Sequence, residues 1–287
     1  MPDLQAIRRR MRAIESTRKM TRAMEMVAAA KLRRAQEQAQ AGRVYADRLN
    51  EVLRRLAASG VQVEHPLLAP PKGSDRLLVV FGSDRGLAGA FNANILREAL
   101  LALRESEPTL LFVLGRRADA ALRHRGWPIR RSWLGIGEEA RIELAHEVAD
   151  MAMQWYIQGT VGRVELIYTE FVSTLRLVPR RLQLLPVVTP VAGDAGRRQA
   201  PVEYIFVPSA EGLLVHLLPA MVRTTVYQAL LDSKASEHAA RMTAMRAATD
   251  NASDLLEDLH LEYNRERQTS ITTEIVEVVS GAEALRG

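Results

Sequence analysis

The sequence predicts a mixed α/β protein with a very long helix at each end of the chain and an α/β domain between them. Residues 4–57 contain no proline and a single glycine, and residues 209–285 contain a single proline. Between these stretches, short runs rich in valine and leucine alternate with helical patterns, an order typical of a parallel sheet covered by helices. We therefore expect three domains: an N-terminal helix in residues 1–60, an α/β domain in 61–208 and a C-terminal helix in 209–287.

The N-terminal helix is predicted from its apolar residues, which first recur three or four positions apart, as in the seam of a coiled coil. The stretch that follows keeps a helical spacing, and its small alanines would let another helix approach closely. A helix that ends before Ser59 and Gly60 has roughly 55 residues and a length of about 80 Å. The expected seam consists of Leu4, Ile7, Met11, Ile14, Met20, Met24, Val27 and Leu32, followed by Val52, Leu53 and Leu56.

The middle of the chain alternates between strand and helix patterns, which predicts a largely parallel sheet. The apolar runs are short, and the first two are each followed by a helical pattern. We expect strands at 77–81, 109–114, 163–171 and 175–188, a helix at 139–158 and a loop at 190–201.

The C-terminal helix repeats the coiled-coil spacing over a longer distance. Its seam steps by three and four residues, shifts by one residue after Tyr263 and then resumes, which is a change of winding and not an end. This seam contains Met242, Met245, Thr249, Ala252, Leu256, Leu259, Tyr263, Ile271, Ile275, Val278 and Ala282.

The two helices are expected to pair in an antiparallel coiled coil. Because the C-terminal helix is longer by roughly 20 residues, its end should project unpaired. That end, "ITTEIVEVVSGAEAL", is apolar, and alone in water it would be an aggregation hazard. We therefore expect other chains to surround it.

The chain carries a formal net charge of +5 and contains no cysteine. Basic residues are concentrated in its first 34 positions, so we expect an acidic partner there: nucleic acid, anionic lipid or an acidic protein surface.

The lack of cysteine excludes disulfides, thiolate metal sites and cysteine nucleophiles. No run of about 20 uninterrupted apolar residues is present, and the N-terminus lacks the pattern of a secretory signal, so direct membrane insertion is not expected.

The stretch "VVFGSDRGLAGAFNANILREAL", residues 79–100, reads as a strand, a glycine-rich turn and a helix, an order that often cradles a phosphate. However, the spacing of Gly82, Gly86 and Gly89 fits neither the dinucleotide fingerprint nor the phosphate loop. The turn contains no lysine, and Asp84 would repel a phosphate. We therefore interpret the glycines as permitting a tight turn in a Rossmann-like domain, and we expect no cofactor.

The six histidines show no metal-ligand spacing, and the sequence places no acid, base and nucleophile together, so we expect neither a metal site nor a catalytic site. Two other functions stay open at this point. A basic coiled coil could bind nucleic acid, although its first aromatic residue is Tyr45, so a binder without base stacking would be nonspecific. An α/β enzyme could use the glycine-rich turn for a nucleotide.

Three stretches resemble one family, the gamma subunit of the rotary F-type ATP synthase of bacterial type. They are "IRRRMRAIESTRKMTRAMEMVAAAKLRRAQ" near the N-terminus, "GSDRGLAGAFN" in the glycine-rich turn, and residues 236–285. The resemblance implies a shaft of two helices inside a ring of three alpha and three beta subunits. It also implies that the α/β domain lies with the epsilon subunit against the membrane ring of c subunits.

Membership of that family would make the chain a non-catalytic subunit, because the catalytic residues belong to the beta subunit. It would be a peripheral protein at the cytoplasmic face of the cell inner membrane, without nucleic acid as a partner. Proton flow through the membrane ring would turn the shaft, which would drive ATP synthesis in the surrounding subunits.

The resemblance also implies which residues contact partners. A basic helix would meet an acidic loop of the beta subunit through charge pairs weak enough to exchange as the shaft turns. A polar contact with a loop of the beta subunit is implied near the C-terminus, where Arg267 could form a forked contact. The implied residues are Arg8, Arg9, Arg12, Lys19, Met24, Arg33 and Arg34 on the first helix, and Arg267, Gln268, Thr272, Glu274 and Glu277 on the second.

Overall fold

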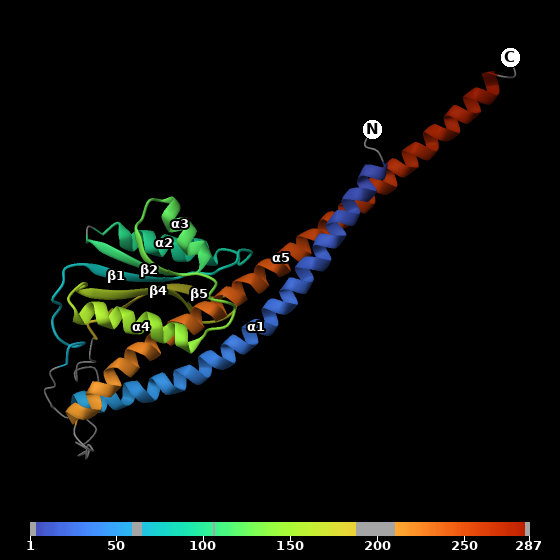
Figure 1. Cartoon of the computed structure of the whole chain (residues 1–287). Coiled ribbons are helices and arrows are strands. Elements are labelled where there is room, and N and C mark those ends of the chain that lie inside the picture. The colour runs from blue at the N-terminus through green and yellow to red at the C-terminus, as the bar shows by residue number, and fades with distance from the viewer. Residues whose placement is uncertain (1–3, 59–64, 106, 188–209, 285–287) are drawn as a thin grey trace. The chain divides into compact units, whose positions relative to one another are not determined.

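A computed structural model describes residues 4–58, 65–105, 107–187 and 210–284 (Figure 1). The predicted fold class, α/β with a long helix at each end, is confirmed. The expected loop at 190–201 lies outside the described residues. In chain order the elements are α1 (Leu4–Ala58), β1 (Arg76–Phe81), α2 (Phe91–Leu103), β2 (Thr109–Leu114), α3 (Arg116–His124), β3 (Ile129–Trp133), α4 (Ile142–Ile157), β4 (Arg163–Phe171), β5 (Leu177–Leu185) and α5 (Ala210–Ala284).

The two terminal helices are exceptionally long. α1 has 55 residues and α5 has 75, so they extend for about 80 Å and about 110 Å. The chain divides into two compact units: α1 up to Ala28 together with α5 from Met242, and residues 29–241. The described residues of the first unit are all helical, and those of the second include all five strands.

The sheet of the second unit has five strands in the order β3-β2-β1-β4-β5. Neighbouring strands run parallel except for β4 and β5, which form an antiparallel pair. β1 lies at the centre, and all six of its residues are buried, as expected for an interior strand covered on both faces. This arrangement brings the carboxyl ends of β1, β2 and β3 to one edge of the sheet.

Each face of the sheet has its own core. Leu78 and Val80 of β1 pack with α2 and α3 on one face, while Leu77, Val79 and Phe81 pack with α4 and α5 on the other. Successive side chains of a strand point to opposite faces, which explains the division. Figure 1 shows the sheet between these two helical layers.

Two details differ from the sequence-based expectation. Strand β3 is missed, because it is short and its two arginines are exposed, so it lacks the apolar run of an interior strand. In α1, Leu53 is buried as expected, but Val52 is exposed, since adjacent positions on a helix do not share a face. The strands expected at 109–114 and 163–171 are confirmed at those bounds.

Candidate partner-contact surfaces

In the first unit, α1 and α5 run antiparallel with an apolar seam between them. On α5 the predicted seam positions Met245, Thr249, Ala252, Leu256 and Leu259 are all buried. They recur every three or four residues, the spacing that keeps side chains on one face of a helix. The seam of α5 is therefore confirmed up to Leu259.

The seam of α1 differs from the expectation at two positions. Met20 and Val27 are 63% and 52% exposed, so their prediction as seam residues is wrong. Thr21 and Ala28 lie inward instead, at the positions that a spacing of three and four residues reaches from Ile14. The apolar pattern misleads here because a small residue, Ala28, and a polar one, Thr21, occupy the positions that face α5.

Polar contacts across the seam fix how the two helices align. The hydroxyls of Thr21 and Thr249 are 2.8 Å apart and share a hydrogen bond. Near the start of α1, Nε of Arg8 donates to the Tyr263 hydroxyl at 2.9 Å, and the guanidinium lies 5.1 Å from the centre of the tyrosine ring. As residue numbers rise along α1 they fall along α5, which confirms the antiparallel pairing.

The basic residues predicted to contact partners are mostly exposed on α1. Arg9 and Arg12 face solvent, whereas Arg8 is engaged with Tyr263. Lys19 pairs with Glu15 at 3.0 Å, and its hydrogen bond and charge lower the pKa of Glu15. Met24 is half-buried, and Arg33 and Arg34, which belong to the second unit, are exposed.

A groove of about 680 Å³ follows the basic face of the first unit. Its lining includes Arg8, Arg12 and Arg18 from α1 and His260 from α5. Glu15 and Glu257 also line it. Because arginines predominate, the groove is suited to an acidic partner.

Beyond Tyr263, residues 264–282 of α5, here called the tip, have almost no burial against the described residues. The five predicted contact residues of the tip, namely Arg267, Gln268, Thr272, Glu274 and Glu277, are all exposed. The large apolar residues of the tip are exposed as well: Ile271, Ile275, Val276, Val278 and Val279. At 100° per residue, these side chains form a stripe about 160° wide on one side of the helix, and such an exposed apolar stripe needs a partner to cover it.

The glycine-rich turn after β1 packs closely against the loop that follows β2. A side chain on Gly82 would approach the Cβ of Ala118 to 2.5 Å, and one on Gly115 would approach the backbone of Ser83 to 2.8 Å. The loops that follow β1 and β2 therefore touch through their backbones, which only glycine permits.

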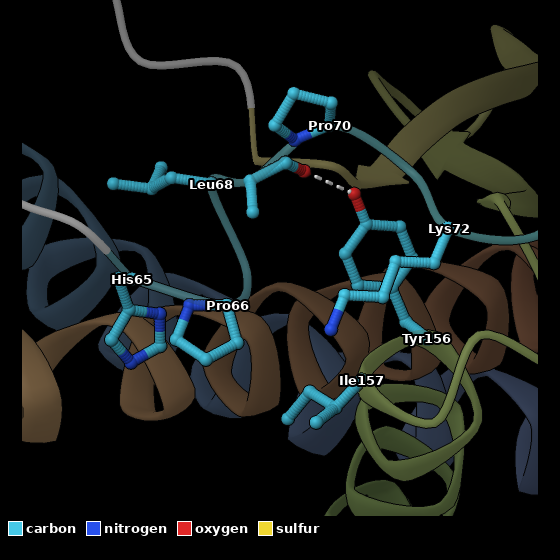
Figure 2. A pocket seen from close by; sticks show the side chains of 8 residues that line it. His65, Pro66, Leu68, Pro70, Lys72, Tyr156 and Ile157 are labelled. Atoms are coloured by element: carbon cyan, nitrogen blue, oxygen red, sulfur yellow. Dashed lines mark hydrogen bonds between the residues drawn. The ribbon is translucent and has the colours of Figure 1, made fainter.

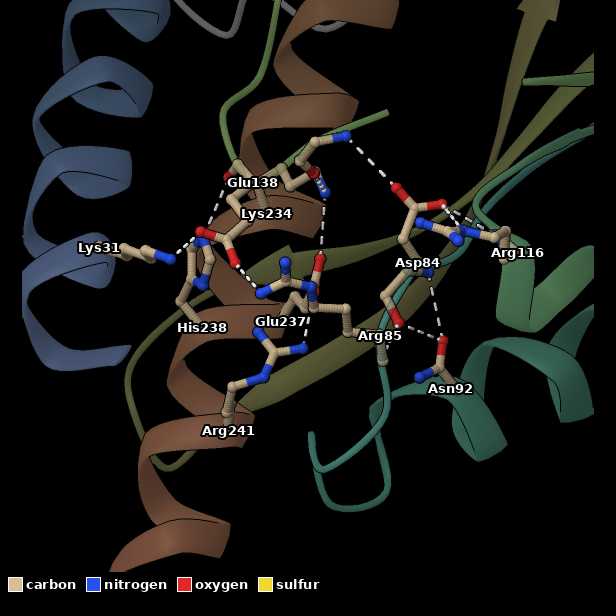
Figure 3. A network of polar contacts seen from close by, with 12 residues as sticks. Lys31, Asp84, Arg85, Asn92, Arg116, Glu138, Lys234, Glu237, His238 and Arg241 are labelled. Atoms are coloured by element: carbon tan, nitrogen blue, oxygen red, sulfur yellow. Dashed lines mark hydrogen bonds and ion pairs between the residues drawn. The ribbon is translucent and has the colours of Figure 1, made fainter. Parts of the chain in front are cut away.

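Asp84 takes the anion-binding position at this edge of the sheet (Figure 3). One carboxylate oxygen accepts the backbone N–H of Arg116, the first residue of α3, at 3.1 Å, and that of Gly135 at 3.0 Å. The other accepts the N–H of Gly137 at 3.3 Å. Burial acts to raise the pKa of Asp84, but these three donors and Lys234 lower it below its usual value. A helix N-terminus attracts anions, and here the chain supplies its own.

A run of charged residues in α5 is buried against the same edge. Every residue from Leu231 to Ala239 is buried. Nζ of Lys234 donates to the carbonyl of Gly137 at 2.6 Å and pairs with Glu237 at 3.2 Å. Glu237 in turn accepts from Arg241 at 2.8 Å. Buried charges need such partners, and the set joins α5 to the loop after β3.

Sequence reasoning did not identify this buried network. The signal that could have found it is the stretch "DSKASEHAA", in which small residues alternate with charged ones. Small side chains let neighbouring elements approach on every side, so the charged residues among them become buried.

A pocket beside the end of α4 lies elsewhere in the second unit (Figure 2). It has a volume of about 660 Å³ and is lined by Pro66, Leu68 and Ile157, with Lys72 beside them. The hydroxyl of Tyr156 donates to the carbonyl of Ala69 at 2.8 Å and fixes the loop that forms one wall. The described lining includes none of the predicted contact residues.

Within the described residues, no group of three or more histidine, aspartate or glutamate side chains could hold a metal ion. One described helix, between Gly212 and Ala282, is long and apolar enough to pass as a membrane span, with a mean hydropathy of 1.2 in its most apolar window. Core helices of soluble proteins pass the same test, so this one helix is weak evidence for membrane insertion.

Comparison with known proteins gives a consistent picture. The profile of the ATP synthase family matches residues 3–285. The ATP synthase gamma chain of Pelotomaculum thermopropionicum is 44% identical over 286 residues, which cover 99% of this chain and all of that protein. The ATP synthase gamma chain of Symbiobacterium thermophilum is 45% identical, with 98% of each chain covered.

Solved structures agree with these relatives. A chain in the central stalk and c-ring structure of the Tetrahymena thermophila mitochondrial ATP synthase is 28% identical, with a TM-score of 0.58 over 80% of this chain and 99% of that one. A chain in a structure of the Euglena gracilis mitochondrial ATP synthase has a TM-score of 0.69 at 19% identity, over 98% of this chain and 94% of that one. The second likeness shows the fold alone.

Proposed function

Because the chain belongs to the ATP synthase gamma chain family, we propose that it is the central shaft of a proton-translocating F-type ATP synthase. It is a subunit of a membrane-associated enzyme complex. Its partners in this proposal are three alpha and three beta subunits, the epsilon subunit and the membrane ring of c subunits. The chain itself has no active site, and it couples rotation of the ring to ATP synthesis and hydrolysis in the beta subunits.

The exposed tip is the observation that supports this function most directly. The apolar side chains from Ile271 to Val279 form a stripe along one side of the helix and have no cover among the described residues. Each such side chain gains roughly 1.5–3 kcal/mol when buried. A ring of subunits around the helix would cover this stripe in every orientation of a turning shaft, which a single docking groove would not.

The paired helices of the first unit suit the transmission of torque. Twisting one helix against the other would expose buried seam residues such as Leu256. It would also break the hydrogen bond between Thr21 and Thr249. The basic groove would meet an acidic loop of the beta subunit, and Arg9, Arg12, Lys19, Arg33 and Arg34 would contribute exchangeable charge pairs. Arg8 and Met24 belong to the same proposed surface.

Different parts of the chain would serve different parts of this function. Residues 1–60 and 209–287 form the shaft, and residues 61–208 form the domain that meets the epsilon subunit and the c-ring. The complex places the chain at the cytoplasmic face of the inner membrane, as a peripheral subunit that neither inserts into the bilayer nor binds nucleic acid.

Assembly with purified alpha and beta subunits tests this function. We expect gel filtration of the mixture to yield a complex with one copy of this chain for three alpha and three beta subunits, and the chain alone to show no ATP hydrolysis. A chain that stays separate from both subunits but binds nucleic acid at physiological salt would refute the shaft function.

Arg267 and Gln268 should matter for coupling and not for folding. Both side chains are exposed, so replacing both by alanine is expected to leave the folded chain as stable as before. A hydrogen bond to a charged group contributes about 1.5–3 kcal/mol, so ATP synthesis in the assembled enzyme should fall at least about tenfold. The measurement is the rate of ATP synthesis in proteoliposomes at a fixed proton gradient.

A matched control is Arg265→Ala, which removes an exposed arginine two residues away. This variant should keep the normal rate. Arg267→Lys should stay impaired, because lysine keeps the charge but loses the forked geometry. An unchanged rate in the double alanine variant would show that the partner contact lies elsewhere on the tip.

A further inference from the structure

A small cavity in the second unit lies between α1, α5 and the loop that follows β3. Its volume is about 80 Å³, and its lining includes Lys31, Arg34, Glu138, Lys234 and His238. One water molecule needs about 10–15 Å³ of such volume. The cavity therefore has room for several waters or for one small tetrahedral anion.

Positive charge predominates around this cavity. The carboxylate of Glu138 lies between Lys31 and Arg85, with ion pairs to both, so its charge is already balanced. Arg34 has no ion pair within the described residues. The charged groups that face the cavity or adjoin it are Lys31, Arg34, Arg85, Lys234 and Arg241, against Glu138, Glu139 and Glu237.

The pKa values of two side chains, Lys31 and His238, reflect both burial and this surplus of positive charge. Burial lowers the pKa of Lys31, and the nearby charges of Arg85 and Arg241 lower it further. Burial likewise lowers the pKa of His238 to about 4, with Arg241, Lys234 and Lys31 acting in the same direction against Glu237. An anion in the cavity would relieve the repulsion that both groups experience.

His238 also presents an unused polar atom. The imidazole is 2% exposed, and its Nε2 lies 3.1 Å from the carbonyl oxygen of Glu138, to which it donates (Figure 3). Nδ1 is buried and has no hydrogen-bond partner among the described residues. A buried polar atom without a partner costs free energy, so a native structure usually provides one.

We propose that this cavity binds one small inorganic oxyanion and that the bound anion accepts a hydrogen bond from a protonated Nδ1 of His238. On binding, one proton from solvent adds to the lone pair of Nδ1, and no other bond forms or breaks. The resulting N–H donates to an oxygen of the anion, while Lys31, Arg34 and Lys234 supply the opposing charge. This inference is independent of the shaft function, because it rests only on the second unit.

Titration calorimetry of the full-length chain with sulfate tests the proposal. Sulfate keeps its charge near neutral pH, so any pH dependence must come from the protein. At constant ionic strength, we expect saturable binding of one sulfate, with affinity falling about tenfold for each pH unit between about pH 4 and pH 6, the interval between the free and the bound pKa of His238, in which sulfate also stays doubly charged. Phosphate should compete for the same site.

Three variants make the test specific. His238→Gln keeps an N–H for the carbonyl of Glu138 but cannot take up a proton, so its sulfate affinity should be weak and independent of pH. Lys31→Gln should weaken binding about tenfold but keep the pH dependence. His146→Gln is the matched control, because His146 lines a separate cavity of about 420 Å³, and it should bind sulfate normally.

A second readout does not depend on any variant. In nuclear magnetic resonance spectra of the wild-type chain, saturating sulfate should raise the pKa of His238 by at least about two units. An unchanged pKa, no saturable binding up to about 50 mM, or binding without pH dependence would overturn the proposal. The last outcome would identify an adventitious ion only.

Discussion

Replacing Ile275 and Val278 by aspartate is expected to leave the chain folded but to reduce its assembly with the alpha and beta subunits at least about 100-fold. In the free chain these side chains are 58% and 73% exposed, so the new charges would lie in water and cost little. Inside a surrounding ring, each would lose about 1.5–3 kcal/mol of apolar burial and add a charge that must be desolvated. A loss of about 3 kcal/mol already exceeds a factor of 100 in the assembly constant.

The measurement is the fraction of chain that enters the complex, by analytical ultracentrifugation across a range of subunit concentrations. Leu175→Asp is a suitable control, because Leu175 is an exposed apolar residue in the turn between β4 and β5. It should assemble normally, as should Ile275→Leu. Normal assembly of the double aspartate variant would mean that no apolar surface surrounds the tip, and the shaft proposal would lose its main support.

Replacing Asp84 by alanine is expected to lower the free energy of unfolding of the second unit by about 3 kcal/mol. The carboxylate accepts three backbone N–H groups, and alanine would leave all three without their acceptor. Hydrogen bonds to a charged group contribute about 1.5–3 kcal/mol each, although water can reach part of the site and reduce the total. Urea denaturation followed by circular dichroism measures the change.

Two comparisons refine this expectation. Asp84→Asn keeps the oxygen that accepts from Arg116 and Gly135 but faces Gly137 with an N–H group, so it should recover about half of the loss.

Because folding lowers the pKa of Asp84, the carboxylate stabilises the native state above the unfolded pKa near 3.8, and this contribution is lost as pH falls through the folded value. The difference between wild type and Asp84→Ala should therefore shrink below about pH 4. An alanine variant as stable as wild type would show that other acceptors replace the carboxylate.

The parts of the fold that depend on local pattern could be predicted from the sequence. α1 and α5 end within a few residues of their expected bounds, because long stretches without helix breakers leave few alternatives. The interior strands β1 and β2 are equally clear, since continuous apolar runs are characteristic of buried parallel strands. The short edge strand β3, with its exposed arginines, carries no such signal.

Features that depend on distant residues could not be predicted. Thr21 is half-buried in the seam, where its hydroxyl meets that of Thr249, and an apolar pattern assigns Met20 to that place instead. Lys234 is buried where the carbonyl of Gly137 accepts its hydrogen bond, and the sequence of α5 does not identify this distant partner. The predicted partner residues are exposed on the structure, as contact residues must be, but their partners are other chains, so their roles stay predictions.

The uninterrupted helix beyond Tyr263 has a geometric consequence. Each residue of an α-helix turns its successors by about 100° and advances them by about 1.5 Å. Arg8 holds Tyr263 in place. The number of residues between Tyr263 and Arg267 therefore sets the direction, around the helix axis, in which Arg267 points. A single residue inserted between them would rotate every side chain of the tip by about 100° around the helix axis, but would move it only about 1.5 Å along that axis. The number of residues in this short interval thus fixes the orientation of the tip around its axis. Substitutions leave that orientation unchanged, whereas insertions change it.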